Sequence, residues 1–324
     1  MKFSITPTRR NRLIFQTGFF VLFALTPVFD LFRYDLYEGH AYFLGFPWLL
    51  GINDFLVGKS TSTLAGLNIL LRLFLPVLLV IAAVVFVAFR WGRIYCGWLC
   101  PHFSVVETIN GLMRRASGKP SVWEKSPLSP IQPNGKQRAQ HPLWWIPTVI
   151  FAVLFAALWG VILLTYLLPP AVIYQNIWDG ALTANQARFI TVATIIFTIE
   201  FLFARHLFCR FGCAAGVFQS LAWMANRAAM VVSFNRLKAA DCAQCQKLGG
   251  QGYAACEAEC PMRLRPRQSK QKMFTCTQCS SCLSACDSVQ KTQQAKPLLR
   301  WVSGAEAKKN EAQISLTGHR DKTK

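Results

Sequence analysis

Four apolar stretches, each long enough to cross a lipid bilayer, constrain the fold of this chain more than any other feature. They cover approximately residues 13–32, 64–89, 143–168 and 189–208, and a membrane span needs about 20 mostly apolar residues. The first stretch is long for the apolar region of a secretory signal and lacks a small-residue cleavage site, so we expect it to be retained. The sequence therefore predicts a polytopic α-helical membrane protein with about four transmembrane helices.

Basic residues are distributed unevenly among the connections between these stretches. Arg9, Arg10 and Arg12 precede the first stretch, many Lys and Arg residues follow the second, and residues 169–187 contain neither. The positive-inside rule therefore predicts that both termini face the cytoplasm, and membrane lipid is one expected partner. The formal net charge of +20 would also suit nucleic acid, but no nucleic-acid-binding motif accompanies it, so we exclude that partner.

Eight of the twelve cysteines lie close together near the C-terminal end, in two runs. One run reads C-x2-C-x10-C-x3-C and the other reads C-x2-C-x2-C-x3-C. In two-cluster iron–sulfur proteins the fourth cysteine of a run ligates the other cluster. On that rule the first cysteine set, which would hold one [4Fe–4S] cluster, is Cys242, Cys245, Cys256 and Cys286. The second cysteine set, which would hold the other cluster, is Cys260, Cys276, Cys279 and Cys282.

Zinc is the main alternative to iron, because it also binds pairs of cysteines separated by two residues. Zinc modules usually place two such pairs around a spacer of roughly 12–20 residues. Here the C-x2-C-x2-C-x3-C run is continuous and no histidine lies near it. A reducing cytoplasm also disfavours disulfides among these cysteines, so the sequence favours two iron–sulfur clusters.

The four remaining cysteines form two C-x3-C pairs, Cys96 with Cys100 and Cys209 with Cys213. Each pair follows an even-numbered span at its cytoplasmic end, which indicates two parallel structural repeats. On a helix this spacing puts both thiols of a pair on one face. Three interpretations stay open: a third metal centre, either iron–sulfur or copper; a redox-active dithiol; or thiols packed as small apolar side chains.

These features divide the chain into five segments. We expect a first two-span repeat at residues 1–116, a cytoplasmic loop at 117–141 and a second two-span repeat at 142–235. A C-terminal cytoplasmic α+β two-cluster ferredoxin-like domain follows at 236–292. Residues 293–324 are polar, charged and free of cysteine, which predicts a mobile tail.

Ionisable residues within or beside the spans are expected to find partners. Asp30 is expected to pair with Arg72, and Glu200 with Arg72 or Arg205; a role for Glu200 in a proton-coupled quinol step is the alternative. His102 and His206 stand beside the two C-x3-C pairs, where an interfacial polar role is more usual than a role as ligand.

The motifs resemble those of the membrane-bound polyferredoxins, a family that includes NapH-, NosR- and CcoG-type proteins. The resemblance covers approximately residues 10–290 and rests on the two cysteine sets and on two further segments. These segments are Tyr95-Cys96-Gly97-Trp98-Leu99-Cys100-Pro101 and Phe208-Cys209-Arg210-Phe211-Gly212-Cys213. The resemblance implies a multi-span anchor in the bacterial inner membrane that carries two cytoplasmic [4Fe–4S] clusters.

The predicted function is electron transfer, as a component of an oxidoreductase system rather than as a stand-alone enzyme. Single electrons would pass between a quinol or cytoplasmic donor and a respiratory membrane or periplasmic acceptor, so a respiratory reductase or oxidase is an expected partner. Two alternatives stay open. One is a copper-handling or cofactor-assembly factor for a terminal oxidase or reductase, and the other is a redox-sensing regulatory membrane protein.

Overall fold

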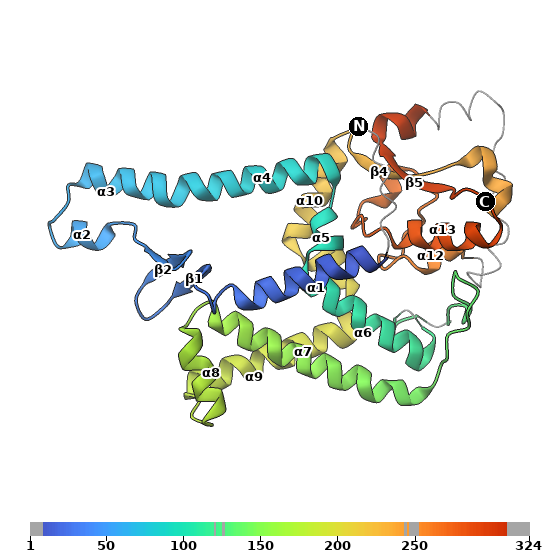
Figure 1. Ribbon diagram of the computed structural model, residues 1–324. Coiled ribbons are helices and arrows are strands. Elements are labelled where there is room, and N and C mark those ends of the chain that lie inside the picture. Colours follow the sequence, from blue (N-terminus) through green and yellow to red (C-terminus); the bar gives the residue numbers. More distant parts are fainter. Residues whose placement is uncertain (1–8, 120, 125–126, 243–244, 246–252, 310–324) are drawn as a thin grey trace. The chain divides into compact units, whose positions relative to one another are not determined.

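The computed structural model of the chain describes residues 9–119, 121–124, 127–242, 245 and 253–309 (Figure 1). The chain forms two compact units, each assembled from separate stretches of sequence. The cysteine unit contains the described residues of Met1–Thr17, Phe86–Val149 and Phe203–Lys324, and the helical unit contains Gly18–Val85 and Ile150–Leu202. All twelve cysteines belong to the cysteine unit.

Among the described residues, three helices are long and apolar enough to cross a membrane. The first, Ser62–Trp91, consists of α3 (Ser62–Ile69), the π-helical turn η1 (Leu70–Phe74) and α4 (Leu75–Trp91). The second, Pro142–Thr165, consists of η2 (Pro142–Trp144) and α7 (Trp145–Thr165). The third, Ala184–Ala204, consists of α9 (Ala184–Ile199) and the π-helical turn η3 (Glu200–Ala204). These helices confirm the last three predicted apolar stretches as helices of spanning length.

The first predicted span, at residues 13–32, is wrong in its extent. Its helix α1 is Arg9–Leu25, only 17 residues long. The first half of α1 carries the buried polar side chains of Arg12 and Gln16, and both hydrogen-bond to the backbone oxygen of Gly97 in the cysteine unit. The helix ends before Thr26, where the chain turns towards a strand. The remaining apolar part of α1 is therefore shorter than the predicted span.

A small antiparallel sheet follows α1 in the helical unit. It contains β1 (Phe32–Asp35), β2 (His40–Phe43) and β3 (Phe46–Trp48), in that order. Asp30 forms an ion pair with Arg33 of β1, so the expected pairing of Asp30 with Arg72 is wrong. Arg72 donates instead to the backbone oxygen of Leu49, at 2.8 Å. The short helices α2 (Ile52–Leu56) and α8 (Pro170–Trp178) complete this unit.

Each long helix that ends in the cysteine unit leads into a C-x3-C pair. After α4 come α5 (Ile94–Trp98) and α6 (Pro101–Ser117); after η3 come η4 (Phe208–Gly212) and α10 (Ala214–Ala225). The second cysteine of each pair, Cys100 or Cys213, is the N-cap of the following helix. Pro101 fits the first position of α6 because proline lacks an N–H that the helix would leave unpaired.

The cysteine-rich C-terminal region combines short helices with a two-stranded sheet. The elements are β4 (Met230–Phe234), η5 (Arg236–Cys242), α12 (Ala255–Ala258), η6 (Lys270–Met273), α13 (Ser281–Thr292) and β5 (Leu299–Ser303). Strands β4 and β5 pair antiparallel and lie side by side in Figure 1. The hydrophobic core beneath them contains all four thiols of the first cysteine set.

The prediction of a mobile tail at 293–324 is wrong for its first part. Leu298, Leu299 and Val302 are buried, because they pack into the same hydrophobic core as the cysteines. Strand β5 pairs with β4 in a register that places Val302 opposite Val231. Residues 310–324 of the predicted tail lie outside the described part of the chain.

Candidate functional site

The second cysteine set lines a single apolar cavity in the cysteine unit. All four thiols contribute to its wall, together with the following neighbours: Val232, Pro261, Met262, Leu264, Pro266, Met273, Thr277, Gln278 and Ser280. Cys260 follows α12, Cys276 and Cys279 lie in the loop before α13, and Cys282 lies in the first turn of α13. Gln278 and Ser280 adopt left-handed backbone conformations, with φ of 54° and 60°, which lets the loop curl around the cavity.

Burial controls the protonation of these thiols. It raises the pKa of Cys260 to about 12 and raises the pKa values of Cys276 and Cys282 well above the ordinary thiol value. Without a bound metal these thiols would be neutral, and metal binding would have to release their protons. The backbone N–H of Leu264 donates to the sulfur of Cys260 at 3.4 Å, an interaction that stabilises a thiolate ligand.

The first cysteine set lies in the hydrophobic core between α12, α13 and the β4–β5 sheet. Cys245 interacts electrostatically with Cys242, Cys256 and Cys286. A hydrogen bond from Cys245 lowers the pKa of Cys242 to about 7, with burial acting in the opposite direction and Arg267 adding to the lowering. The backbone N–H of Leu298 donates to the sulfur of Cys286 at 3.3 Å.

Electrostatic contacts connect the thiols within each predicted ligand set, but Cys282 of the second set also belongs to the core that surrounds the first set. Cys286 lies with the first set although it ends the second run, and Cys260 lies with the second set although it ends the first run. Ligation of iron by these groups stays a prediction. Among the described residues, no three Cys, His, Asp or Glu side chains are gathered as closely as ligands of one metal ion. The ligands of a [4Fe–4S] cube bind four different iron atoms, so they are spaced around the cube.

The residues fit an iron–sulfur cluster on three structural grounds. Four thiols converge on one buried cavity, the other lining groups are largely apolar, and backbone N–H groups point at sulfur. Low polarity and amide hydrogen bonds to sulfur are two of the means by which proteins set the potential of such clusters.

The C-x3-C pairs lie close to the second cysteine set. Cys209 belongs to a buried cluster with Phe103, Met262, Leu264 and Cys279, and Cys100 packs against that cluster. Cys96 is a neighbour of Gln219, with 3.4 Å between Sγ and Oε1. Electrostatic interactions connect Cys96 and Cys100 with Cys213, and the Cys209 sulfur lies 3.6 Å from Nδ1 of His102.

Gly97, directly after Cys96 of the first C-x3-C pair, lies against the backbone of the second cysteine set. A Cβ added there would lie 2.3 Å from the backbone oxygen of Thr277 and 2.9 Å from Cα of Cys279. The neighbouring Trp98 donates from Nε1 to the backbone oxygen of Gln278 at 3.0 Å. Only glycine fits between these two segments, so the first pair and the second set are in direct backbone contact.

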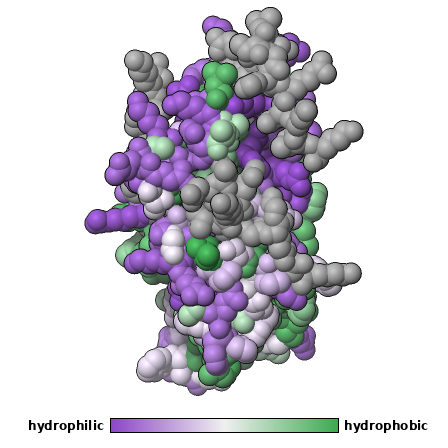
Figure 2. Space-filling model, turned by 90° about the vertical axis from the view of Figure 1, so that its right-hand side faces the viewer, coloured by the Kyte–Doolittle hydropathy of each residue, from purple (hydrophilic) through white to green (hydrophobic). Residues whose placement is uncertain are grey.

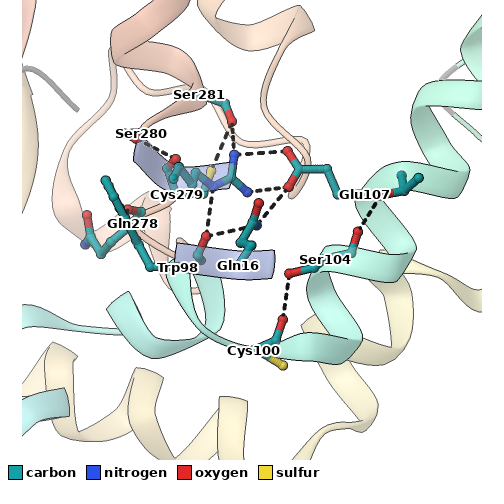
Figure 3. Close-up of polar contacts among 12 residues, drawn as sticks. Gln16, Trp98, Cys100, Ser104, Glu107, Gln278, Cys279, Ser280 and Ser281 are labelled. Atoms are coloured by element: carbon teal, nitrogen blue, oxygen red, sulfur yellow. Dashed lines mark hydrogen bonds and ion pairs between the residues drawn. The ribbon is translucent and has the colours of Figure 1, made fainter. Parts of the chain in front are cut away.

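Arg12 of α1 connects the same segments, and sequence reasoning did not identify it as part of the site. Its guanidinium donates to the Gly97 oxygen at 2.8 Å and to Ser281 Oγ at 3.1 Å, and it forms an ion pair with Glu107 of α6. Figure 3 shows Ser281 and Glu107, two of these partners, on either side of this network of polar contacts. A positive residue at the start of an apolar stretch is usual for a membrane anchor. The sequence around Arg12 therefore did not indicate that this side chain has a structural role.

His102 and His206 both lie beside the C-x3-C pairs, as the sequence indicated. His206 is fully enclosed, and burial, with smaller contributions from the charges of Arg205, His102 and Arg12, lowers its pKa to about 3. The ring of His206 packs against Phe103, with 5.2 Å between the ring centroids. A neutral, packed imidazole is consistent with a structural role for His206.

Comparison with known proteins bears on part of this region. A family model described as a 4Fe-4S binding domain matches residues 73–120, which include Cys96 and Cys100. The chain is also similar to an uncharacterized protein of Methanocaldococcus jannaschii, with 25% identity over 197 residues, or 60% of this chain and 69% of the relative. No solved structure matches the chain. The chain thus contains a 4Fe–4S binding domain, which implies a role in iron–sulfur electron transfer in general.

Proposed function

We propose that the protein is a membrane-anchored electron-transfer protein of the membrane-bound polyferredoxin type, with two [4Fe–4S] clusters in its cysteine unit. The first cysteine set would hold one cluster and the second set the other. The observation that carries the proposal is the cavity lined by all four thiols of the second set, Cys260 among them. A cluster bound there would supply one-electron chemistry.

The two sets are close enough to work as a relay. The thiols of Cys256 in the first set and Cys282 in the second interact electrostatically, and Cys282 also belongs to the core that surrounds the first set. The protein's contribution is to exclude water with apolar side chains, to donate backbone N–H groups to sulfur, and to fix the separation of the sets. These are the features that set the potential and the rate of electron transfer.

Anchoring in the bacterial inner membrane is supported by the three long apolar helices. None of the most apolar part of Ser62–Trp91 is buried inside the protein, so lipid or another membrane protein must cover it. By contrast, the face of the molecule shown in Figure 2 is largely hydrophilic. This difference and the positive-inside rule favour a cytoplasmic location for the clusters. Electrons would come from a quinol or a cytoplasmic donor and pass to a respiratory reductase or oxidase.

Anaerobically purified protein in detergent provides the test. The parent should contain about eight iron atoms for the two sets together, should bleach when reduced with dithionite, and should recover its colour when a short-chain quinone is added. A variant with both Cys276→Ala and Cys279→Ala should lose about four iron atoms, the content of one cube. A parent that contains zinc in place of iron, or that stays reduced with quinone and with every soluble acceptor tried, would refute the proposal.

A further inference from the structure

A buried cation lies beside the C-x3-C pairs, and the proposed function does not use it. Arg93 comes three residues before Cys96 and is 1% exposed. Its Nη2 donates to the backbone oxygen of Cys209 at 2.7 Å, and its guanidinium also interacts electrostatically with the thiol of Cys96. Arg93 therefore contacts one cysteine from each pair.

The positive charge of Arg93 is only partly compensated by hydrogen-bond acceptors and anions. Within the described part of the chain, its Nε and Nη1 have no hydrogen-bond partner. No carboxylate there forms an ion pair with it either; the nearby acceptors are a carbonyl and a thiol. A buried guanidinium is stable only when an anion and a full set of acceptors compensate its lost hydration. Negative charge at the cysteines would supply this compensation.

The chain also makes room for this guanidinium. Gly216 in α10 lies so close that an added Cβ would be 2.2 Å from Nη2 of Arg93. Because Gly216 is three residues after Cys213, the second pair and its helix are shaped around the arginine of the first pair. The segments that carry the first and the second C-x3-C pair together fix the position of Arg93.

We propose that Cys96, Cys100, Cys209 and Cys213 hold a third [4Fe–4S] cluster, with Arg93 as its buried counter-charge. Four thiolates around such a cube give a centre with a net charge of about −2, which supplies the anion that Arg93 lacks. The thiols come from two separate segments, as the spaced ligands of a cube require, and the matched 4Fe-4S binding domain includes Cys96 and Cys100.

This inference rests on the proposed function, because it extends the relay by one centre. Gly97 brings the first pair into backbone contact with Thr277 and Cys279, and the charge of Arg93 also acts on Cys276 of the second set. The third cluster would therefore exchange electrons with the cluster of the second set. It would lie at the point where α4 and η3 enter the cysteine unit, next to the ends of two membrane helices.

Iron and sulfide analysis of anaerobically purified, full-length protein tests the third cluster. The parent should contain about twelve iron atoms, four for each of three cubes. Cys96→Ala and, separately, Cys213→Ser should lower the content to about eight, while the electron paramagnetic resonance signals of the two cysteine sets persist. The half-exposed Cys213 provides a milder change should the buried Cys96 variant fail to fold.

Arg93 variants test the counter-charge. Arg93→Gln should lower the reduction potential of the third centre or cause its loss, because a positive charge beside an anionic cluster is removed, whereas Arg93→Lys should retain most of the iron. A parent with about eight iron atoms, or with one copper or zinc ion or a disulfide at these cysteines, would overturn the inference and leave the two-cluster proposal intact. A parent protein that shows no electron paramagnetic resonance signal from either of the two cysteine sets would instead reject the proposed function.

Discussion

The contact at Gly97 allows a sharp test of how the C-x3-C segment is held against the second cysteine set. In Gly97→Ala, the new methyl group would lie 2.3 Å from the backbone oxygen of Thr277, whereas ordinary contacts begin at 3.4 Å. The two backbones must therefore separate by about 1 Å, since neither is a flexible side chain.

The cost of this separation follows from the contacts that it strains. Overpacking a tight site costs about 1–3 kcal/mol. The flanking hydrogen bonds, from Arg12 to the Gly97 oxygen and from Trp98 to the Gln278 oxygen, contribute about 1–3 kcal/mol each, with the charged one at the upper end. Partial loss of both gives an expected total of about 3–5 kcal/mol, a large share of the usual stability of a domain.

Thermal unfolding in detergent and iron analysis of the same sample provide the measurement. Gly97→Ala should unfold at a lower temperature and should lose iron from the second cysteine set before the first. Gly111→Ala is the matched control: Gly111 lies in α6 of the same unit, and nothing lies within 4 Å of an added Cβ. Alanine should stabilise that helix slightly. Equal stability and iron content for the two variants would show that the contact at Gly97 is absent in the protein.

Three further predictions concern the ligand sets, the buried ion pair and pH. Cys286→Ala should give the same residual paramagnetic spectrum as Cys256→Ala, with about four iron atoms fewer than the parent, since both belong to the first set; different spectra would contradict the grouping. Arg12→Ala should destabilise the protein by about 3 kcal/mol because it removes the ion pair with Glu107 and the hydrogen bonds to the Gly97 oxygen and Ser281. Lys291→Ala, at an exposed pair, should cost less than about 0.5 kcal/mol; similar unfolding temperatures for the two variants would refute this. The pKa of His206 falls from 6.5 to about 3 on folding, so between these values only the unfolded chain binds a proton at this residue. The free energy of unfolding should therefore fall by about 2 kcal/mol from pH 8 to pH 5. Unfolding measured across this pH range should show a smaller loss for His206→Gln.

The long helices and the grouping of the cysteines could be anticipated because both depend on local pattern. Apolar length alone predicted spans at residues 64–89, 143–168 and 189–208, and the corresponding helices are Ser62–Trp91, Pro142–Thr165 and Ala184–Ala204. The spacing of the cysteines also predicted that the last cysteine of each run lies near the other run, and Cys286 does lie near Cys242 and Cys260 near Cys279. Iron ligation itself stays a prediction.

The features that were missed depend on contacts between distant segments. Arg12 and Gln16 are recruited by the Gly97 oxygen, 80 or more positions away, and this shortens the apolar part of α1. Strand β5 has no strand signal strong enough to stand out in a polar tail, and it forms because β4 and the cysteine core offer it a partner. Tertiary contact overrides local composition at both places.

The pairing of β4 with β5 has a consequence for biosynthesis. Val232 and Trp301 are partners in the sheet although about 70 residues separate them, and every cysteine of the two sets lies between these strands. The β4–β5 sheet, which encloses the cysteine segment, therefore cannot form until residue 303 has left the ribosome. The long helices that precede this segment have already been synthesised by then. Iron would then be loaded after translation has passed the last ligand, and an open, thiol-rich loop would stay exposed to oxidants during that interval.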